Sequence, residues 1–328
     1  MKALYTQTSI ISKLKKAFFE IFSKEGNHTK EHLVEMFLSV LCLNGFQSVR
    51  YNYQSVPMDE KYGEDCFLSV IPEHLFRHLI ILSIDDTMVE KHGEHFENRE
   101  LLFDHAKHNG SNYLNGHCFV SVMLSIPVFD NGVIHYLSFP IGYRMWTKEE
   151  TKLDMAADMI REVMDIIGHE RNVCLCCDSW YPKGEITELP QQYGNLALIC
   201  NVRHDTALYD LPPAKTGKKG RPRVRGQKLS FDNFEFSPVE GTDYSVGTRQ
   251  VVTNLFGHKP VHAIVTKTQN GSQRLFICTK APDQLLFAFD SDKLGKASAF
   301  AKAEVRFLPL TIYSMRWHIE VAYYDLNP

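Results

Sequence analysis

The sequence predicts an α/β fold in which helices cover a mixed β-sheet. Three observations lead to this prediction: short β-branched apolar runs, an amphipathic helical pattern between them, and an Asn131-Gly132 pair joining two extended segments. The resulting order is strand, hairpin, helix, strand, strand. With 328 residues, 44% of them hydrophobic and 23% charged, the chain has the composition of a globular protein with one large or two ordinary domains. A disordered, collagen-like or coiled-coil chain is excluded.

Residues 1–75 are expected to form a helical N-terminal region. Apolar residues recur at helical spacing over residues 10–22 and again over residues 33–41. A polar break at residues 24–30 separates the two expected helices. This region is either a small helical domain or a helical lid on the sheet that follows.

The first strands of the sheet are expected after residue 76. Residues 79–84 form a short apolar run that stops at Asp85-Asp86-Thr87, as a buried strand would. Two further strands, at residues 118–128 and 133–143, are joined by Asn131-Gly132. An Asn-Gly pair between extended segments is the strongest short-range signal for a β-hairpin.

The next elements are a helix and two buried strands. Residues 152–167 carry one apolar stripe at helical spacing, and Gly168 follows as a stop signal. Residues 173–177 form another buried apolar run, which also stops at an aspartate, Asp178. Residues 196–202 are the fifth expected strand, so residues 76–202 make up the first part of the sheet domain.

A basic segment rich in Gly and Pro follows the sheet. Residues 214–228 contain seven basic residues and no acidic one, in a chain whose formal net charge is −3. A solvated loop is the ordinary explanation of such a run. However, the Gly-Arg-Pro-Arg sequence at residues 220–223 is narrow and extended, and its arginines could enter a DNA minor groove. Both interpretations stay open.

The rest of the chain is expected to form a β-rich insertion and a terminal helix. Four β-like runs lie at residues 229–236, 248–256, 261–268 and 274–279. Together with the basic segment they define an insertion over residues 203–285. Residues 286–328 then return to the sheet domain, and residues 310–326 fit a single helix.

Cysteine usage and hydropathy predict a cytoplasmic protein. Eight cysteines are too few for a disulfide scaffold in a chain of this length, and Cys174, Cys176 and Cys177 are expected to be reduced thiols of the core. No apolar stretch reaches the roughly 18 residues that a membrane span needs. No signal peptide precedes the first helix, so no membrane association is expected.

Asp85 and Asp178 are the first candidate site residues. Each directly follows an apolar strand, and the carboxyl ends of neighbouring strands are where an α/β sheet usually holds its site. Two carboxylates brought that close together repel each other unless a divalent cation such as Mg²⁺ neutralises them. The alternative is that aspartate is simply common where a strand becomes a turn.

The terminal helix supplies three more candidates, Tyr313, Arg316 and Glu320. Their i, i+3, i+7 spacing places them on one helical face. In this arrangement Glu binds a cation, Arg holds a phosphate through two hydrogen bonds, and Tyr adds another. The alternative is an exposed face with one Arg–Glu ion pair.

These residues resemble the DDE transposases of bacterial insertion sequences, in the group with a Tyr-x2-Arg-x3-Glu-x6-Lys signature. Tyr313, Arg316 and Glu320 match its first three positions. Ile84-Asp85-Asp86-Thr87 looks like the first-aspartate motif, and Cys177-Asp178-Ser179-Trp180-Tyr181 looks like the second. The Gly-Arg-Pro-Arg segment also resembles one in the β-rich insertion of these enzymes. The likeness covers about residues 75–328.

The resemblance implies a ribonuclease H-like fold and metal-dependent cleavage and strand transfer at transposon ends. Two Mg²⁺ ions about 4 Å apart, with Mn²⁺ as a substitute, would activate water or a 3′ hydroxyl for attack on a DNA phosphodiester. Asp85, Asp178 and Glu320 are implied as catalytic metal ligands. Asp86 is the rival of Asp85, which is preferred because a D-x-T pattern then ends the strand.

The resemblance also implies partners. The DNA partner is the inverted-repeat ends of the transposon and the target DNA, contacted by the helical N-terminal region and bound by a homodimer of the protein. The expected DNA-contacting residues are Tyr313, Arg316, Lys218, Lys219, Arg221, Arg223 and Arg225. Trp180 could stack on a base, but it is expected to cover the core. The expected location is the bacterial cytoplasm, at the nucleoid when DNA is bound.

One position departs from the signature. Its lysine would fall at Asn327, and the chain stops at Pro328. A shortened transposase is therefore expected. Two alternatives remain: an inactive remnant that only binds DNA, and a ribonuclease H-like nuclease outside transposition.

Overall fold

The computed structural model describes residues 78–93, 95–103, 112–130, 133–214, 221–239, 242–288 and 307–326. The chain divides into two compact units, one of which is formed by His74–Glu320 and holds the sheet. The predicted helices of residues 1–75 lie outside the described residues. Within the described ranges, no helix is long and apolar enough to cross a membrane.

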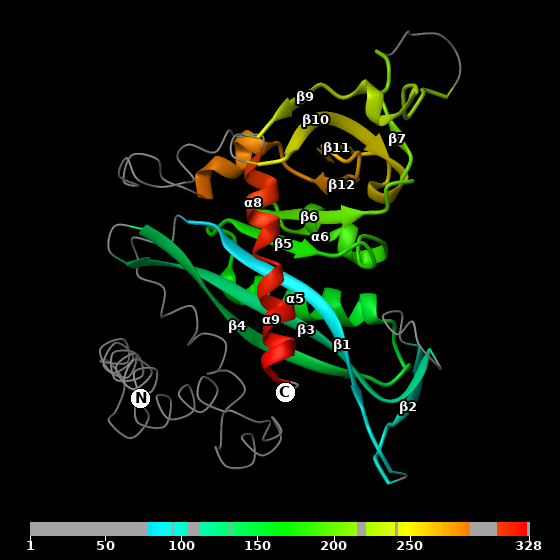
Figure 1. Ribbon diagram of the computed structural model, residues 1–328, viewed down its shortest axis with the longest axis vertical. Coiled ribbons are helices and arrows are strands. Elements are labelled where there is room, and N and C mark those ends of the chain that lie inside the picture. The colour runs from blue at the N-terminus through cyan, green and yellow to red at the C-terminus, as the bar shows by residue number, and fades with distance from the viewer. Residues whose placement is uncertain are drawn as a thin grey trace. The chain divides into compact units, whose positions relative to one another are not determined.

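Five strands form the first half of the sheet (Figure 1). They are β1 (Ile80–Glu90), β3 (Tyr113–Asp130), β4 (Val133–Trp146), β5 (Val173–Cys177) and β6 (Leu196–Val202). Their spatial order is β4-β3-β1-β5-β6. β1, β5 and β6 are mutually parallel, whereas β3 is antiparallel to both β1 and β4. The expected mixed α/β sheet is thereby confirmed.

β1 is longer than the sequence predicted. Its parallel pairing with β5 ends at Ile84 opposite Cys177, but its antiparallel pairing with β3 continues to Glu90 opposite Gly116. The prediction that the strand stops at Asp85 was therefore wrong. The polar residues after Ile84 remain in β1 because β3, itself 18 residues long, supplies backbone partners along that whole length.

The local predictions for the hairpin and for the helix of residues 152–167 are confirmed. β3 and β4 pair up to Asp130 opposite Val133. α5 (Lys152–Ile167) begins after Thr151, whose side chain accepts a hydrogen bond from the backbone N–H of Asp154. It ends at Gly168, which has a φ of 75°, a conformation that glycine adopts without steric cost.

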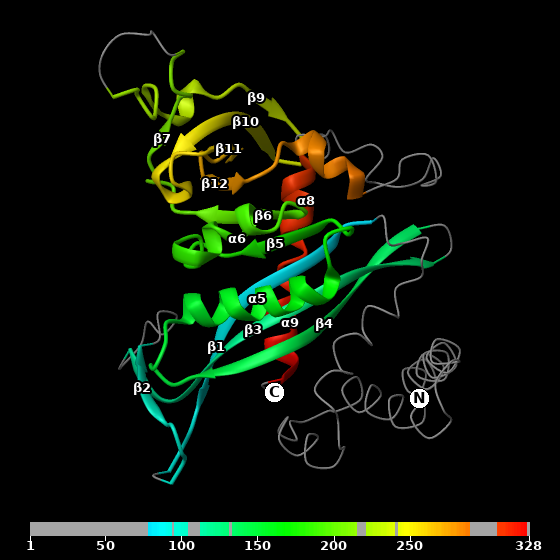
Figure 2. The same ribbon diagram turned by 180° about the vertical axis from the view of Figure 1, so that it is seen from behind.

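Helices cover both faces of the sheet. α8 (Leu308–Ser314) and the start of α9 (Trp317–Leu326) lie in front of the strands in Figure 1, and α5 lies in front of them in the opposite view of Figure 2. Ile312 of α8 packs in a buried cluster with Cys174, Cys176 and Cys278. Among the described residues every cysteine is free and buried, as the sequence predicted for Cys174, Cys176 and Cys177.

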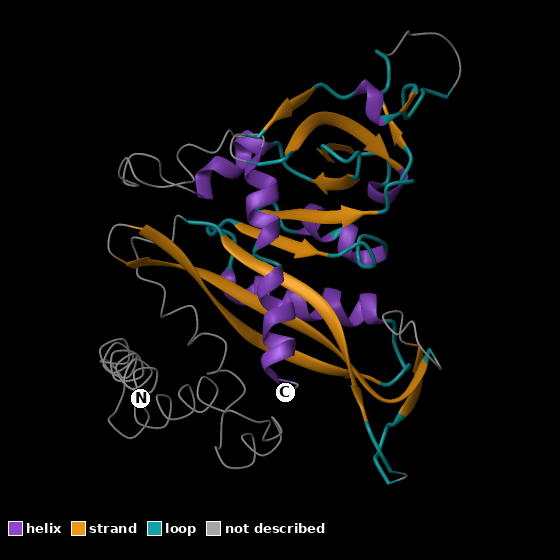
Figure 3. Cartoon of the chain, viewed as in Figure 1, coloured by secondary structure: helices purple, strands orange, loops and turns teal. Residues whose placement is uncertain are grey.

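The β-rich insertion extends the same sheet (Figure 3). Its strands are β7 (Leu208–Tyr209), β8 (Lys228–Leu229), β9 (Phe236–Pro238), β10 (Tyr244–Thr253), β11 (Pro260–Thr268) and β12 (Gln273–Cys278). β12 pairs antiparallel with β6, and β11 and β10 follow it. With the short edge strand β2 (Glu100–Phe103) beside β3, the described sheet has 12 strands.

One predicted strand of the insertion was wrong. Residues 229–236 are interrupted by a 3₁₀ turn at Phe231–Asn233. Ser230 and Asn233 close that turn reciprocally, each side chain accepting a hydrogen bond from the other residue's backbone N–H. Local capping therefore prevails over the β-like pattern of Leu229, Phe231 and Phe236.

Short helical segments make the remaining connections. A 3₁₀ turn at Gly184–Thr187 and α6 (Leu189–Gln192) link β5 to β6, and 3₁₀ turns also occur at Asn254–Phe256 and Pro282–Ala288. The single terminal helix predicted for residues 310–326 is instead two helices, α8 and α9. At Met315 and Arg316 the backbone makes tighter i to i−3 hydrogen bonds, which ends α8 before α9 begins.

Candidate functional site

Asp85 and Asp178 occupy equivalent positions on neighbouring strands. Ile84 of β1 pairs with Cys177 of β5, so Asp85, within β1, and Asp178, directly after β5, are the next residues beyond this pair. Burial and the negative charge of Asp178 raise the pKa of Asp85 from 3.8 to about 7. Burial also raises the pKa of Asp178, against the opposing effects of the Trp180 N–H and the Arg316 charge. The negative charge of Asp178 therefore reaches the Asp85 carboxyl and disfavours its ionisation.

Arg316 connects Asp85 to Glu320. Its Nη1 donates a hydrogen bond of 3.0 Å to Oδ2 of Asp85, and its Nη2 donates to Oε1 of Glu320. The Arg316 side chain is only 12% exposed. Burial alone would lower the pKa of Arg316, but Tyr313, Asp85 and Glu320 raise it. The guanidinium is thus held between a carboxylate of β1 and one of α9.

Tyr313 lies beside the guanidinium, in α8. Its ring packs edge-on against Phe276 with centroids 5.0 Å apart, and the Arg316 guanidinium carbon is 5.8 Å from its ring centroid. Burial raises the pKa of the Tyr313 phenol, so this group stays protonated and can donate a hydrogen bond at neutral pH. The structure therefore brings together Asp85, Asp178, Tyr313, Arg316 and Glu320, although Tyr313 and Glu320 are in different helices.

Asp86 has a different set of partners. Its Oδ2 accepts a hydrogen bond of 2.7 Å from Lys152 Nζ, and its Oδ1 accepts one of 3.1 Å from the Tyr181 hydroxyl. The Cys118 thiol donates to Oδ2 at 3.5 Å. Successive residues of a strand point to opposite faces of the sheet. Asp85 therefore faces Arg316, whereas Asp86 faces α5.

Lys152 and Tyr181 were missed by sequence reasoning. Only indirect evidence in the sequence indicated that these residues lie near the site. Lys152 is the first residue of α5, and Tyr181 is three residues from Asp178. Nothing in their spacing indicates that both side chains meet Asp86.

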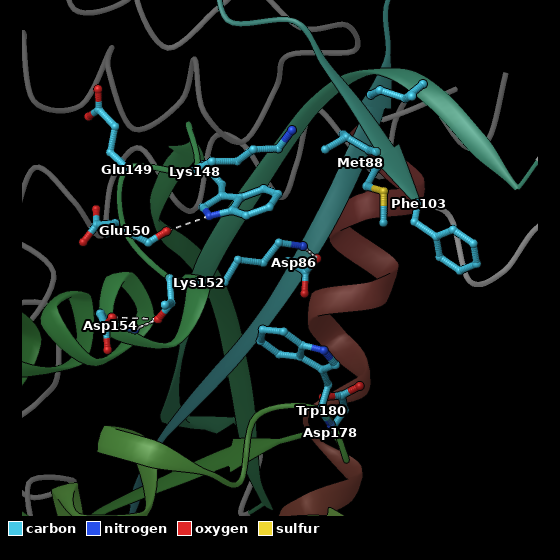
Figure 4. A pocket seen from close by; sticks show the side chains of 14 residues that line it. Asp86, Met88, Phe103, Lys148, Glu149, Glu150, Lys152, Asp154, Asp178 and Trp180 are labelled. Carbon is cyan, nitrogen blue, oxygen red and sulfur yellow. Dashed lines mark hydrogen bonds and ion pairs between the residues drawn. The ribbon is translucent and has the colours of Figure 1, made fainter.

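A pocket of about 980 Å³ opens beside Asp86 and Asp178 (Figure 4). It is lined by residues of β1, β2 and the start of α5, and by Trp146 and Trp180. The prediction that Trp180 covers the core was wrong, because its side chain is 40% exposed while neighbouring Tyr181 is fully buried. Lys183 Nζ lies 4.0 Å from the Trp180 ring centroid, a cation–π contact that holds the indole at the surface.

The basic segment is only partly described. Lys218 and Lys219 lie outside the described residues. Arg221 and Arg223 are exposed, whereas Arg225 stacks on Tyr209 at 4.1 Å and donates a hydrogen bond of 3.2 Å to Asn254 Oδ1. These arginines flank β8, at the opposite end of the strand order from β2, so the structure does not place them at the carboxylates.

Two of the three candidate carboxylates are held by Arg316. Among the residues that the structure describes, no three His, Cys, Asp or Glu side chains are grouped closely enough to hold a metal ion. The Arg316 guanidinium already pairs with both Asp85 and Glu320. Three carboxylate side chains are nevertheless the donor chemistry that Mg²⁺ and Mn²⁺ prefer. Asn327, the departure from the signature, lies outside the described residues.

No family model matches this chain. No curated protein matches it either.

Proposed function

We propose that this protein is a metal-dependent DNA transposase of the DDE type, with Asp85, Asp178 and Glu320 as its catalytic carboxylates. The observation that carries the proposal is the meeting of Asp85 and Glu320 on Arg316, with Asp178 at the position next to Asp85. β1 and α9 contribute one carboxylate each, and the residue directly after β5 contributes the third. Three carboxylates of this kind would supply the ligands of a two-metal phosphodiester reaction once they close around the cations.

A ribonuclease H-like core is part of the same proposal. Support comes from the chain order of the first five strands of the sheet. A meander of three antiparallel strands, β1, β3 and β4, leads through α5 to β5 and β6, which lie parallel to β1. The insertion strands then continue the sheet beyond β6 through β12. In this order Asp85 lies on β1, and Asp178 directly follows the adjacent parallel strand β5.

The three carboxylates would hold Mg²⁺ or Mn²⁺, which would activate a water or a 3′ hydroxyl and neutralise charge on the phosphate under attack. The chain's own residues then have defined tasks. Arg316 moves from Asp85 and Glu320 to a DNA phosphate, which its fork of N–H donors fits. The protonated phenol of Tyr313 donates a further hydrogen bond beside it. Release of Arg316 leaves the carboxylates free to bind the cations.

DNA binding in this proposal involves the exposed arginines of the insertion. Arg221 and Arg223 have no structural role in the described contacts and are available to phosphates. Arg225 is instead tied to Tyr209 and Asn254. The proposed DNA is the pair of inverted-repeat ends of an insertion sequence together with a target, bound by a homodimer.

A cleavage assay tests the proposal. Linear DNA carrying the sequences that flank the coding region is incubated with the protein and Mg²⁺ or Mn²⁺. Wild-type protein should cut at the ends of the inverted repeats, and Asp178→Ala should not. Asp205→Asn is the matched control, because Asp205 pairs with Arg203 at the surface. Equal cutting by the wild type and Asp178→Ala would exclude the proposed catalytic role.

One observation favours a second candidate, a DNA-binding protein without catalytic turnover. Arg316 already pairs with Asp85 and Glu320, so two of the three carboxylates have a cationic partner without a metal. For this candidate, binding to DNA should weaken with salt while no cleavage occurs with either cation. The same assay therefore separates the two functions. Cleavage without dependence on inverted repeats would indicate a nuclease outside transposition.

A further inference from the structure

The Tyr181 hydroxyl links the turn after β5, which carries Asp178, to strand β1, which carries Asp85 and Asp86. Asp178 follows β5, and Tyr181 lies three residues later. Tyr181 is fully buried, and its hydroxyl donates a hydrogen bond of 3.1 Å to Oδ1 of Asp86 on β1. The turn is therefore attached to β1 at two points: Cys177 pairs with Ile84 at its start, and Tyr181 reaches Asp86 at its end.

Asp178 is oriented inside this closed turn. Its Oδ1 accepts a hydrogen bond of 2.9 Å from the backbone N–H of Trp180. This bond sets the direction of the carboxylate relative to the turn, and the turn is set relative to β1 by Tyr181. The position of Asp178 beside Asp85 therefore depends on a hydroxyl that is bonded to Asp86.

Lys152 holds the other side of the same Asp86 carboxylate. Its Nζ forms an ion pair of 2.7 Å with Asp86 Oδ2, and the two side chains are only 15% and 18% exposed. The ammonium also lies 5.0 Å from the Trp146 ring centroid and 5.8 Å from that of Trp180. Figure 4 shows Lys152 reaching Asp86 from the start of α5. Asp86 thus joins β1, α5 and the turn after β5.

We propose that Asp86, Tyr181 and Lys152 form a positioning network that fixes Asp178 relative to Asp85. The inference rests on the proposed function and deepens it: Asp86 supports the metal-binding carboxylates without being one of them. None of the three is a catalytic residue, because each acts through the turn. Groups that orient metal ligands commonly change metal affinity or activity by 10- to 100-fold when they are removed.

Tyr181→Phe tests the network, because it removes only the hydroxyl. Tyr193→Phe is the matched control: Tyr193 also donates to an aspartate, Asp165, but from the connection between α6 and β6 and without contact to the turn. Both variants are compared with the wild type in thermal unfolding, in binding of Mn²⁺ alone, in DNA cleavage and in hydrogen exchange of the Trp180 amide.

For Tyr181→Phe we expect the hydrogen-exchange rate of the Trp180 amide and the dissociation constant for Mn²⁺ each to rise about tenfold. The kcat of cleavage should fall by a similar factor with KM for DNA unchanged. Tyr193→Phe should match the wild type in all of these. If Tyr181→Phe does not fold, Lys152→Gln is the second variant, since it keeps one N–H donor for Asp86 and should show the same changes to a smaller extent.

The outcomes separate the network from the proposed function. If the Trp180 amide of Tyr181→Phe exchanges at the wild-type rate, the network is overturned, whatever the cleavage results are. Faster exchange with unchanged Mn²⁺ binding and kcat would also overturn it, because the turn would then not govern the site. Absence of Mn²⁺ binding and cleavage in the wild-type protein would overturn the proposed function, and the exchange at Trp180 would still decide whether Tyr181 holds the turn.

Discussion

Asp85 and Arg316 are 231 positions apart in the sequence and are joined by a hydrogen bond of 3.0 Å between Oδ2 and Nη1. Both side chains are less than one-fifth exposed. The contact ties β1 to the junction between α8 and α9. It also keeps the cation next to two aspartates that repel each other, and this charge opposes the rise in the pKa of Asp85 that burial and Asp178 cause.

The first prediction concerns Arg316→Gln. Removing the cation leaves Asp85 and Glu320 unpaired, so the free energy of unfolding in metal-free buffer should fall by about 3 kcal/mol. Added Mg²⁺ should recover part of this loss if the carboxylates bind it. Urea unfolding measures both effects. The control is Arg203→Gln, which removes an exposed ion pair with Asp205 and should cost less than about 1 kcal/mol. Equal losses in both variants would contradict the prediction.

The second prediction concerns pH. The pKa of Asp85 is raised from 3.8 to about 7, so the folded protein keeps a proton that the unfolded chain releases in this window. Stability therefore falls as the pH rises from about 4 to 7, because ionised Asp85 is disfavoured in the fold. Asp85→Asn cannot ionise and should gain stability relative to the wild type at pH 8 but not at pH 4. Unfolding in metal-free buffer at both pH values tests this, and a gain that does not depend on pH would refute it.

The third prediction separates the two neighbouring aspartates. Asp85→Asn should abolish DNA cleavage while the protein stays folded. Asp86→Asn should retain weak cleavage but lower the free energy of unfolding by about 2 kcal/mol, since Lys152 loses a charged partner in a partly buried place. Cleavage rates and urea unfolding of both variants provide the measurement. Complete loss of cleavage in Asp86→Asn, with retention in Asp85→Asn, would reverse the assignment.

The fourth prediction concerns the arginines of the insertion. Replacing Arg221 and Arg223 by alanine should weaken DNA binding and reduce the slope of log affinity against log salt by about 2, one unit for each lost phosphate contact. Arg225→Ala should mainly lower stability, because Arg225 stacks on Tyr209 and bonds Asn254. Binding titrations between roughly 50 and 200 mM salt distinguish these effects. An unchanged slope in the double variant would exclude both residues as phosphate contacts.

Elements whose signals are local were predictable from the sequence. The bounds of α5, β5 and β6 agree with the predicted ranges, and the Asn131-Gly132 pair correctly predicted the β3–β4 hairpin. Each depends on side-chain periodicity or turn chemistry within a few residues. Where a local pattern was ambiguous, as at Phe231–Asn233, capping hydrogen bonds decided the outcome.

The candidate site was predictable only as a set of residue types. Motif spacing selected Asp85, Asp178, Tyr313, Arg316 and Glu320, and the structure gathers these five. Motif spacing could not decide between Asp85 and Asp86 from their contacts. Both residues lie in β1 and differ only in the face of the sheet to which they point. Nor could motif spacing reveal Lys152 and Tyr181, whose partner Asp86 lies 66 and 95 positions away in the sequence.

By itself, the sequence determined the α/β class, the positions of most strands and the carboxylate, guanidinium and phenol residues of the candidate site. Only the tertiary structure decided that β1 continues past its aspartates, that the terminal helix divides at Arg316, and which face each aspartate occupies. The physical reason is that local propensity acts over a few residues. Strand length, ion pairing and the direction of a buried carboxylate depend on partners supplied by distant parts of the chain.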